Sequence, residues 1–237
     1  MAKVWRGFGF EPTLSFLGTE SERKELRLEE HGEVVTLDPS FGARRAVRDW
    51  RVTWGLFYAA SLFPVDICMT HGIDQIPLSR YFDSLFLCPD KYVVGLADAY
   101  GSDSIFPSSH HVAVGELFKS ELEVENRWED EITKVEKYGE EHKSEFSLPF
   151  FDQRTFWGLD EIRSSSLLLR SPSADLKQGI FHSVLRQNRL DRGTSLHYDP
   201  RRLLEGGYSE IHCPRPILPH TRYIETLLSG INYAPNK

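Results

Sequence analysis

Two histidines and an aspartate near the carboxyl end of the chain are residue types that bind ferrous iron. His197 and Asp199 form an HxD pair, and His220 follows Asp199 after 21 positions. Two imidazoles and one carboxylate leave open positions on the metal for substrate and oxygen. Asp199 stands directly before Pro200, however, and this order is typical of a residue that caps the start of a helix. We therefore expect a cap here and predict no metal site.

The adjacent residues His110 and His111 are a second candidate for metal binding. Neutral histidines bind a metal ion when three or four ligands converge, and nothing nearby in the sequence completes such a set. We expect this pair to face solvent or to cap a helix.

The sequence lacks the better-defined catalytic and cysteine motifs. GxxxxGK[ST], HExxH and GxSxG are absent, and no GxGxxG leads from a strand into a helix. Cys68, Cys88 and Cys213 are far apart and include no CxxC pair, which argues against a disulfide framework and against a zinc site built from cysteines. We expect reduced thiols and, in our leading hypothesis, no cofactor.

Three dispersed residues have the types needed to handle a dinucleotide. Arg6 lies in the aromatic segment 3–10, which predicts a strand, and Ser61 lies in the apolar segment 52–68, which predicts two buried strands. Glu210 lies in a predicted strand over 208–213, near the carboxyl end. An arginine neutralises a pyrophosphate, and a carboxylate stabilises positive charge that develops only in the transition state.

This order of arginine, serine and glutamate resembles that of ADP-ribosyltransferases and related NAD-cleaving toxins. The resemblance implies NAD as the cofactor, with Arg6 and Ser61 binding it. It also implies that Glu210 is the catalytic residue that stabilises the oxocarbenium-like ribose during loss of nicotinamide. Tyr208 departs from the family pattern, which has an acidic or amide residue there, and this argues against transfer to a protein side chain. An NAD-cleaving enzyme is therefore the alternative hypothesis.

The negative charge of the chain is concentrated in one segment. The net charge is -7, and residues 116–141 hold ten acidic and four basic residues, a local charge of -6. Leu122, Trp128 and Ile132 follow helical spacing within this segment. The pattern predicts a long acidic amphipathic helix near 112–138, either continuous or broken near 123–126.

Our leading hypothesis is a non-enzymatic binding or regulatory module of the inhibitor or immunity type. It would engage a basic protein partner through the acidic face of the predicted helix, by charge complementarity. The predicted contact residues are Glu125, Glu129, Asp130 and Glu131. A helix face that is only solvated is the competing interpretation.

Nucleic acid and membrane are not expected as partners. Arg44, Arg45 and Arg48 form a small basic patch, but the chain as a whole is negative, which disfavours nucleic acid. The longest apolar run, 54–63, is about half of the roughly 18 residues that a membrane span needs. No secretory signal is evident at the amino terminus, so we expect a cytoplasmic protein.

The order of predicted elements indicates the α+β class. Strands and helices alternate irregularly, without a repeat or a regular βαβ period. The 237 residues fall in the range of one domain. We predict one mixed-sheet domain over 1–237 with several packing helices, and the polar segment 138–149 is the candidate for a lobe boundary.

Overall fold

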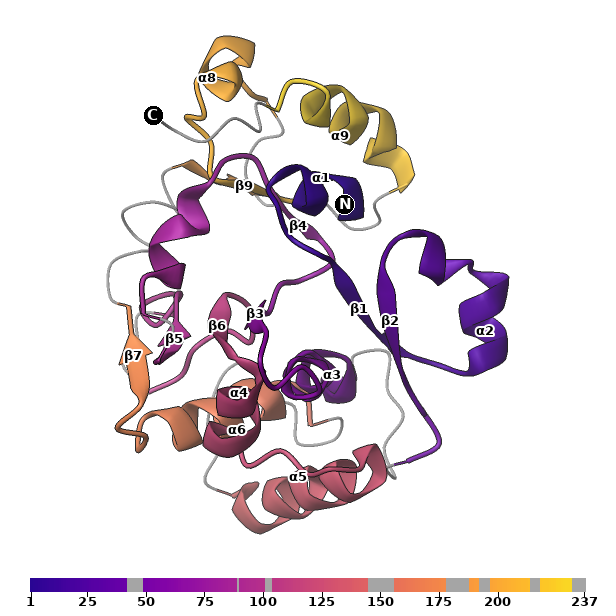
Figure 1. Cartoon of the computed structure of the whole chain (residues 1–237), viewed down its shortest axis with the longest axis vertical. Helices are drawn as coiled ribbons and strands as arrows, with labels where there is room; N and C mark the ends of the chain where they lie inside the picture. Colours follow the sequence, from indigo (N-terminus) through magenta and orange to yellow (C-terminus); the bar gives the residue numbers. More distant parts are fainter. Residues whose placement is uncertain are drawn as a thin grey trace.

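The computed structural model describes residues 1–41, 49–88, 90–100, 104–144, 156–177, 188–191, 197–213 and 218–231. Within these ranges, helices pack on small parallel and antiparallel sheets (Figure 1), which confirms the predicted α+β class. The predicted basic patch at Arg44, Arg45 and Arg48 lies outside the described residues. No helix in the described ranges combines the length and the apolar character needed to cross a membrane.

The helices are distributed along the whole chain. They are α1 (Ala2–Gly7), α2 (Glu20–Glu25), α3 (Trp50–Ser61), α4 (Gly115–Glu121), α5 (Trp128–His142), α6 (Leu159–Leu168), α8 (Pro200–Leu204) and α9 (Thr221–Leu228). The short 3-10 helices are η1 (Leu28–Glu30), η2 (Tyr81–Phe86) and η4 (Leu218–His220).

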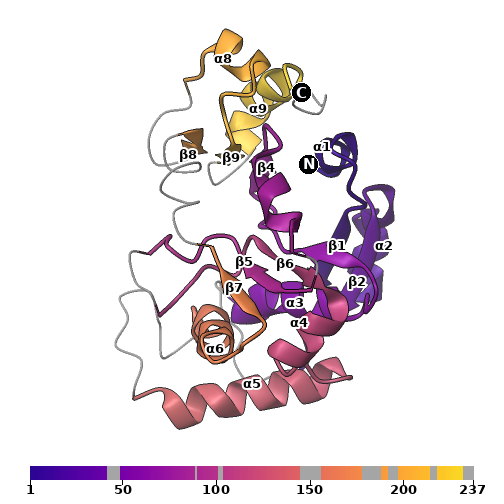
Figure 2. The same cartoon turned by 60° about the vertical axis from the view of Figure 1, so that its left-hand side comes forward.

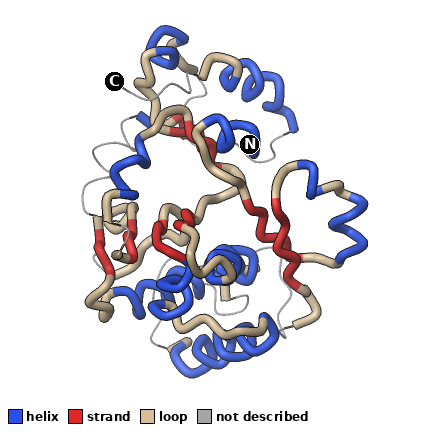
Figure 3. Tube along the Cα trace, in the orientation of Figure 1, coloured by secondary structure: helices blue, strands red, loops and turns tan. Residues whose placement is uncertain are grey.

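The strands, drawn in red in Figure 3, form three separate sheets among the described residues. The first is the parallel pair β1 (Thr13–Leu17) and β2 (Glu33–Leu37). The second has the order β3 (Ile67–Met69), β6 (His111–Val114), β5 (Tyr92–Val94) and β7 (Ala174–Leu176). The third has the order β4 (Gln75–Pro77), β9 (Glu210–His212) and β8 (Leu190–Asp191).

The four-stranded sheet separates two hydrophobic cores. Successive side chains of a strand point to opposite faces. Tyr92 and Val94 accordingly pack with residues of α3, α4, α5 and α6, whereas Val93 packs with residues of α1, β4, β9 and α9. Figure 2 shows the sheet between these two groups of elements.

The predicted strand at 3–10 is wrong, because this segment contains the helix α1. Val4, Trp5 and Phe8 are buried, and residues four positions apart lie on one side of a helix. The alternation of aromatic residues and glycines resembled the two-residue period of a strand and concealed this spacing.

The prediction of two strands over 52–68 is also wrong, because the segment begins in α3 and only its end forms β3. Asp49 starts the helix by accepting a hydrogen bond from the Arg51 backbone N–H over 3.0 Å. Most residues of α3 are buried. A segment without a polar face shows no helical period, so its pattern does not distinguish a helix from a strand.

The acidic helix predicted near 112–138 is divided in the structure. Residues 112–114 belong to β6, so the predicted start is wrong, and the rest forms α4 and α5. Glu123 lies between the two helices with a left-handed φ of 52°. This position agrees with the predicted break near 123–126.

The predicted burial of the apolar stripe is confirmed. Leu122, Trp128 and Ile132 are all buried against the first core. The first part of the predicted lobe boundary is helical, because α5 extends to His142. Residues 145–149 lie outside the described residues, and the boundary stays a prediction.

Candidate functional site

Five polar side chains from five separate segments meet between the second and third sheets. His71 follows β3, His110 precedes β6, Tyr81 begins η2, Arg189 precedes β8 and Glu210 begins β9. The rings of His71 and His110 have centroids 4.6 Å apart. Their meeting depends on contacts between elements distant in sequence, since no local motif brings these residues together.

Strand pairing places the members of this cluster. The Thr70 backbone N–H donates to the carbonyl of His111 over 2.9 Å, and the His110 N–H donates to the carbonyl of Thr70 over 2.7 Å. These bonds extend the β3–β6 ladder and bring the two histidines together. In the third sheet, Glu210 pairs with Pro77 of β4.

The Glu210 carboxylate is the centre of the cluster. Its Oε2 atom accepts a hydrogen bond from the Tyr81 hydroxyl over 2.6 Å and lies 3.2 Å from His110 Nε2 and 3.4 Å from His71 Nε2. Its Oε1 atom lies 2.9 Å from Arg189 Nε. The Tyr81 oxygen is also 2.6 Å from His110 Nε2. One carboxylate oxygen therefore faces the histidines, and the other faces the arginine.

The cluster is enclosed, and its charges are shifted accordingly. Glu210 and His110 are both 0% exposed. Burial alone raises the pKa of Glu210, but its neighbours His110 and Arg189 hold that pKa well below its usual range. Burial lowers the pKa of His110, and burial followed by the Glu210 charge raises the pKa of Tyr81. An ionised carboxylate therefore faces a neutral imidazole and a protonated phenol.

The orientation of His71 leaves one ring nitrogen facing the carboxylate. His71 Nδ1 lies 3.2 Å from the Gly72 carbonyl oxygen. A carbonyl only accepts hydrogen bonds, so we assign the proton to Nδ1, and Nε2 then presents a lone pair. This buried Nε2 makes no hydrogen bond and faces Glu210 Oε2. In the neutral ring, two buried acceptors thus face each other.

The backbone at His110 is in an uncommon conformation. Its φ is 64°, which is the left-handed region that non-glycine residues rarely adopt. Such strain persists only where surrounding contacts hold it, and it is concentrated at functional sites. Here the bond from the His110 N–H to the Thr70 carbonyl, the bond from the Gly95 N–H to the His110 carbonyl and the contacts with Tyr81 and Glu210 hold the ring inside the cluster.

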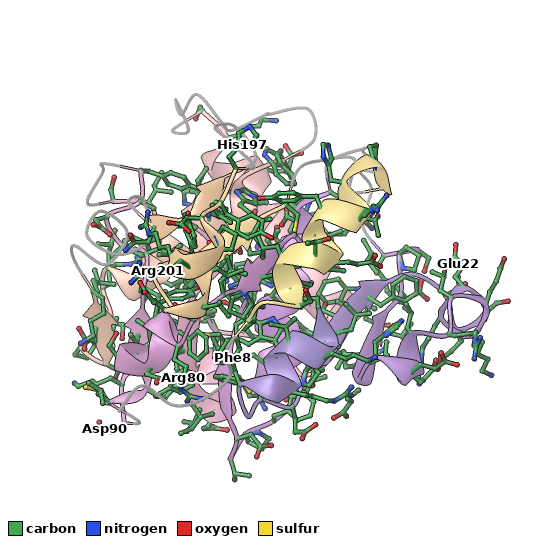
Figure 4. All side chains as sticks on the ribbon, turned by 90° about the horizontal axis from the view of Figure 1, so that it is seen from above. Phe8, Glu22, Arg80, Asp90, His197 and Arg201 are labelled. Atoms are coloured by element: carbon green, nitrogen blue, oxygen red, sulfur yellow. The ribbon has the colours of Figure 1, made fainter. Side chains whose placement is uncertain are left out.

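His71, His110 and Glu210 have ligand atoms close enough to share a metal ion. Within the described residues, no other group of three or more histidine, cysteine or acidic residues meets this condition. The atoms of His71, His110 and Glu210 all lie within 4.8 Å of one another. His197, Asp199 and His220, which the sequence analysis considered and set aside, are not such a group. Asp199 caps α8, as the sequence predicted, and Figure 4 shows His197 at the edge of the molecule.

Sequence reasoning considered His110 and missed most of its neighbours. His110 was set aside because no ligand lies nearby in the sequence, and Glu210 was assigned to a different chemistry. His71, Tyr81 and Arg189 carry no motif that marks them, and the 100 positions between His110 and Glu210 are bridged only by the fold.

The three residues predicted to handle NAD are in different surroundings. Arg6 is exposed on α1, in a helix where the sequence predicted a strand. Ser61 is buried at the end of α3, where its hydroxyl donates to the Tyr58 carbonyl over 2.7 Å. Glu210 lies in β9, in agreement with the predicted strand. Among the contacts of the described residues, none joins these three side chains.

One of the four predicted partner-binding acids is in the interior. Glu131 is 0% exposed, which makes its predicted place on the accessible face wrong. Its carboxylate accepts hydrogen bonds from the Trp54 indole over 2.8 Å and from the Glu125 backbone N–H over 2.6 Å. These bonds, together with Lys134 Nζ at 3.2 Å, offset the cost of burying the charge.

The other three acids lie at the surface and have cationic neighbours. Glu125 is 3.1 Å from Lys134, while Glu129 pairs with Arg127 and Asp130 lies 3.9 Å from the same arginine. Exposed pairs of this kind contribute little to stability. They do reduce the negative field that this surface presents to a partner.

The fold and the site together define an α+β protein with a buried cluster of two histidines, a glutamate, a tyrosine and an arginine. Comparisons of the chain with models of protein families, with curated proteins and with solved structures give no match. The chemistry of the cluster is therefore the basis for the functional proposal.

Proposed function

We propose that this protein binds a divalent transition metal ion through His71 Nε2, His110 Nε2 and Glu210 Oε2. The observation that carries the proposal is the pair of acceptors formed by His71 Nε2 and Glu210 Oε2, which face each other over 3.4 Å inside the protein. A buried polar atom without a partner is costly, and a cation between two acceptors removes that cost. A second proton on His71 is the competing explanation.

The contacts of Glu210 Oε2 with the two imidazoles have the spacing of metal ligands, and the two imidazole nitrogens lie within 4.8 Å of each other. With ligands about 2.0–2.1 Å from zinc, tetrahedral geometry sets neighbouring ligand atoms roughly 3.3 Å apart. The distances from Glu210 Oε2 to His110 Nε2 and to His71 Nε2 are 3.2 Å and 3.4 Å. The contact from His71 Nδ1 to the Gly72 carbonyl is the kind of bond that fixes the tautomer of a metal-binding histidine.

The set of ligands favours a catalytic centre over a structural one. Structural zinc sites are closed by four protein ligands, whereas catalytic sites keep an open position. Two imidazoles and a carboxylate also suit ferrous iron. The Tyr81 oxygen, 2.6 Å from both His110 Nε2 and Glu210 Oε2, is placed to bind the metal or to hold a metal-bound water. We therefore propose a metal-dependent enzyme.

Zinc titration of metal-free protein by calorimetry tests the proposal. We expect one zinc ion per chain with a Kd of about 1 μM or tighter, and weaker binding at low pH because protons compete for the ligands. His71→Ala and Glu210→Gln each remove a ligand and should weaken binding by more than about 100-fold. The exposed His31 provides the matched control, since His31→Ala should bind as the natural chain does.

Circular dichroism of each variant separates loss of a ligand from loss of the fold. Equal zinc affinity in a folded His71→Ala protein would overturn the proposal. Failure of the natural chain to bind zinc, ferrous iron or cobalt would do the same and would assign a proton to His71 instead.

The basic protein partner and the cytoplasmic location predicted from the sequence remain proposals. Glu125, Glu129 and Asp130 support the partner because they keep carboxylates at the surface of one segment. Cleavage of NAD also remains a prediction. A rise in melting temperature at millimolar NAD is the measurement that checks it.

A further inference from the structure

A pocket of about 220 Å³ adjoins the cluster. Its lining residues are Ser79, Arg80, Tyr81, Asn188, Gly206, Gly207, Tyr208 and Ser209. Tyr81 belongs both to this lining and to the cluster. Asn188 directly precedes Arg189, and Ser209 directly precedes Glu210. The pocket is therefore built on the same segments as the proposed metal centre.

The pocket is rich in hydrogen-bond donors. The Ser209 hydroxyl is buried and has no hydrogen-bond partner. The side-chain oxygen of Asn188 accepts a bond from Arg202, which leaves the amide N–H groups of that side chain as its donors. Arg80 is the one charged residue among the lining residues, and no acidic residue is among them.

The contacts of Arg80 fix the position of its guanidinium group. Its Nε forms an ion pair with Asp83 over 2.8 Å, which offsets part of its charge, and its Nη1 donates to the Phe8 carbonyl over 3.1 Å. Figure 4 shows Arg80 and Phe8 close together. An arginine held in this way binds carboxylate and phosphate groups with defined geometry.

We propose that this pocket binds a small molecule that carries a carboxylate or phosphate group. The charge of Arg80 and the donors of Asn188 and Ser209 define the chemistry, and the volume limits the size. Pockets for drug-sized ligands span about 300–1,000 Å³, so the ligand is smaller than these. The ligand is the substrate class of the proposed metal centre, so this inference rests on the proposed function. Tyr81 is the residue that joins the pocket to the metal centre.

Titration of inorganic phosphate and of acetate, each followed by calorimetry, tests the pocket. Two ligands distinguish the oxyanion types, and we expect at least one to bind. Because a charged donor binds an oxyanion more strongly than a neutral one, Arg80→Gln should weaken that binding roughly tenfold or more. Ser79→Leu should also weaken it by filling the pocket. The exposed Arg201 supplies the matched control, since Arg201→Gln removes a similar charge from α8 outside the lining.

The result that overturns this inference is no binding of either anion to the natural chain, with or without zinc. Binding that Arg80→Gln and Ser79→Leu leave unchanged overturns it as well, because the anion then lies elsewhere. Zinc binding without anion binding leaves the metal centre intact and removes only the pocket. Anion binding without zinc binding, or anion binding that persists in His71→Ala while zinc binding is lost, supports the pocket independently of the metal.

Discussion

The Glu131 carboxylate accepts a hydrogen bond from the Trp54 indole over 2.8 Å, across 77 positions of sequence. This bond joins α5 to α3 in the interior of the protein. Glu131 is completely buried, and its second oxygen accepts from the Glu125 backbone N–H. A residue whose type and position suggest a surface charge therefore connects two helices and the turn before α5.

Truncation of Glu131 should destabilise the protein. Glu131→Ala leaves the Trp54 indole and the Glu125 N–H without their acceptor and removes a buried charge partner of Lys134. Breaking one partner of a buried pair costs about 3–5 kcal/mol, and urea unfolding measures that loss. Asp130→Ala on the exposed side of the same helix is the control and should change stability by less than about 0.5 kcal/mol. Equal effects of the two substitutions would contradict the structural role.

Charge reversal on the exposed part of the acidic surface tests the predicted basic partner. Replacing Glu125, Glu129 and Asp130 by lysine, with Glu131 left intact, should slow association with a basic partner several-fold at low salt. The effect should fade as ionic strength rises, because salt screens exposed charges. The rate of association measured at two salt concentrations checks this. An unchanged rate at low salt would sink the hypothesis of a partner steered by charge.

The Glu161 carboxyl should make stability depend on pH. Its side chain accepts a hydrogen bond from Tyr100 over 2.9 Å. Burial and then the neighbouring Asp160 raise its pKa from 4.5 to about 8. Between these two values the folded chain binds a proton that the unfolded chain has released, so the free energy of unfolding falls as pH rises through this window. Below pH 4.5 the contribution is fully present.

Glu161→Gln removes this titration and should flatten the decline in stability between pH 5 and about pH 8. Urea unfolding at several pH values measures the slope for each chain. The raised pKa of Asp160 leaves part of the decline in both proteins. Burial lowers the pKa of His111 to about 4, and its titration is common to both, so it does not affect their difference. Glu140→Gln on the surface serves as the control, and parallel slopes for all three chains would refute the assignment.

Gly115 should not tolerate a side chain. A Cβ atom at this position would overlap the backbone carbonyl oxygens of Phe63 and Ala60, where α4 begins beside the end of α3. Because backbone atoms cannot move aside easily, Gly115→Ala should cost about 1–3 kcal/mol or more. Ser120→Ala, at an exposed position of the same helix, should be close to neutral. Thermal unfolding of both variants decides whether this close approach limits the packing of the two helices.

Local signals in the sequence predicted several elements correctly. Asp199 caps α8, as its position before Pro200 predicted. The helical spacing of Trp128 and Ile132 predicted which side of α5 is buried. These features depend on contacts within a few residues, which is the range over which a sequence pattern carries information.

Two helices were predicted as strands. Ser61 was assigned to a strand because α3 is apolar on nearly every side. Arg6 was assigned to a strand because aromatic residues and glycines alternate around it. In both cases the helix is established by the surfaces that cover it, and neither surface is local in sequence.

By itself the sequence determined the α+β class, the caps and the acidic segment with its buried stripe, because each depends on composition or on neighbours within one or two helical turns. Only the tertiary structure decided that Glu131 is internal and that His71, His110 and Glu210 share one site. Hydrogen-bond pairing of distant strands brings those three residues together. Which polar side chains are buried is set by the elements that pack over them, and this information is spread over the whole chain.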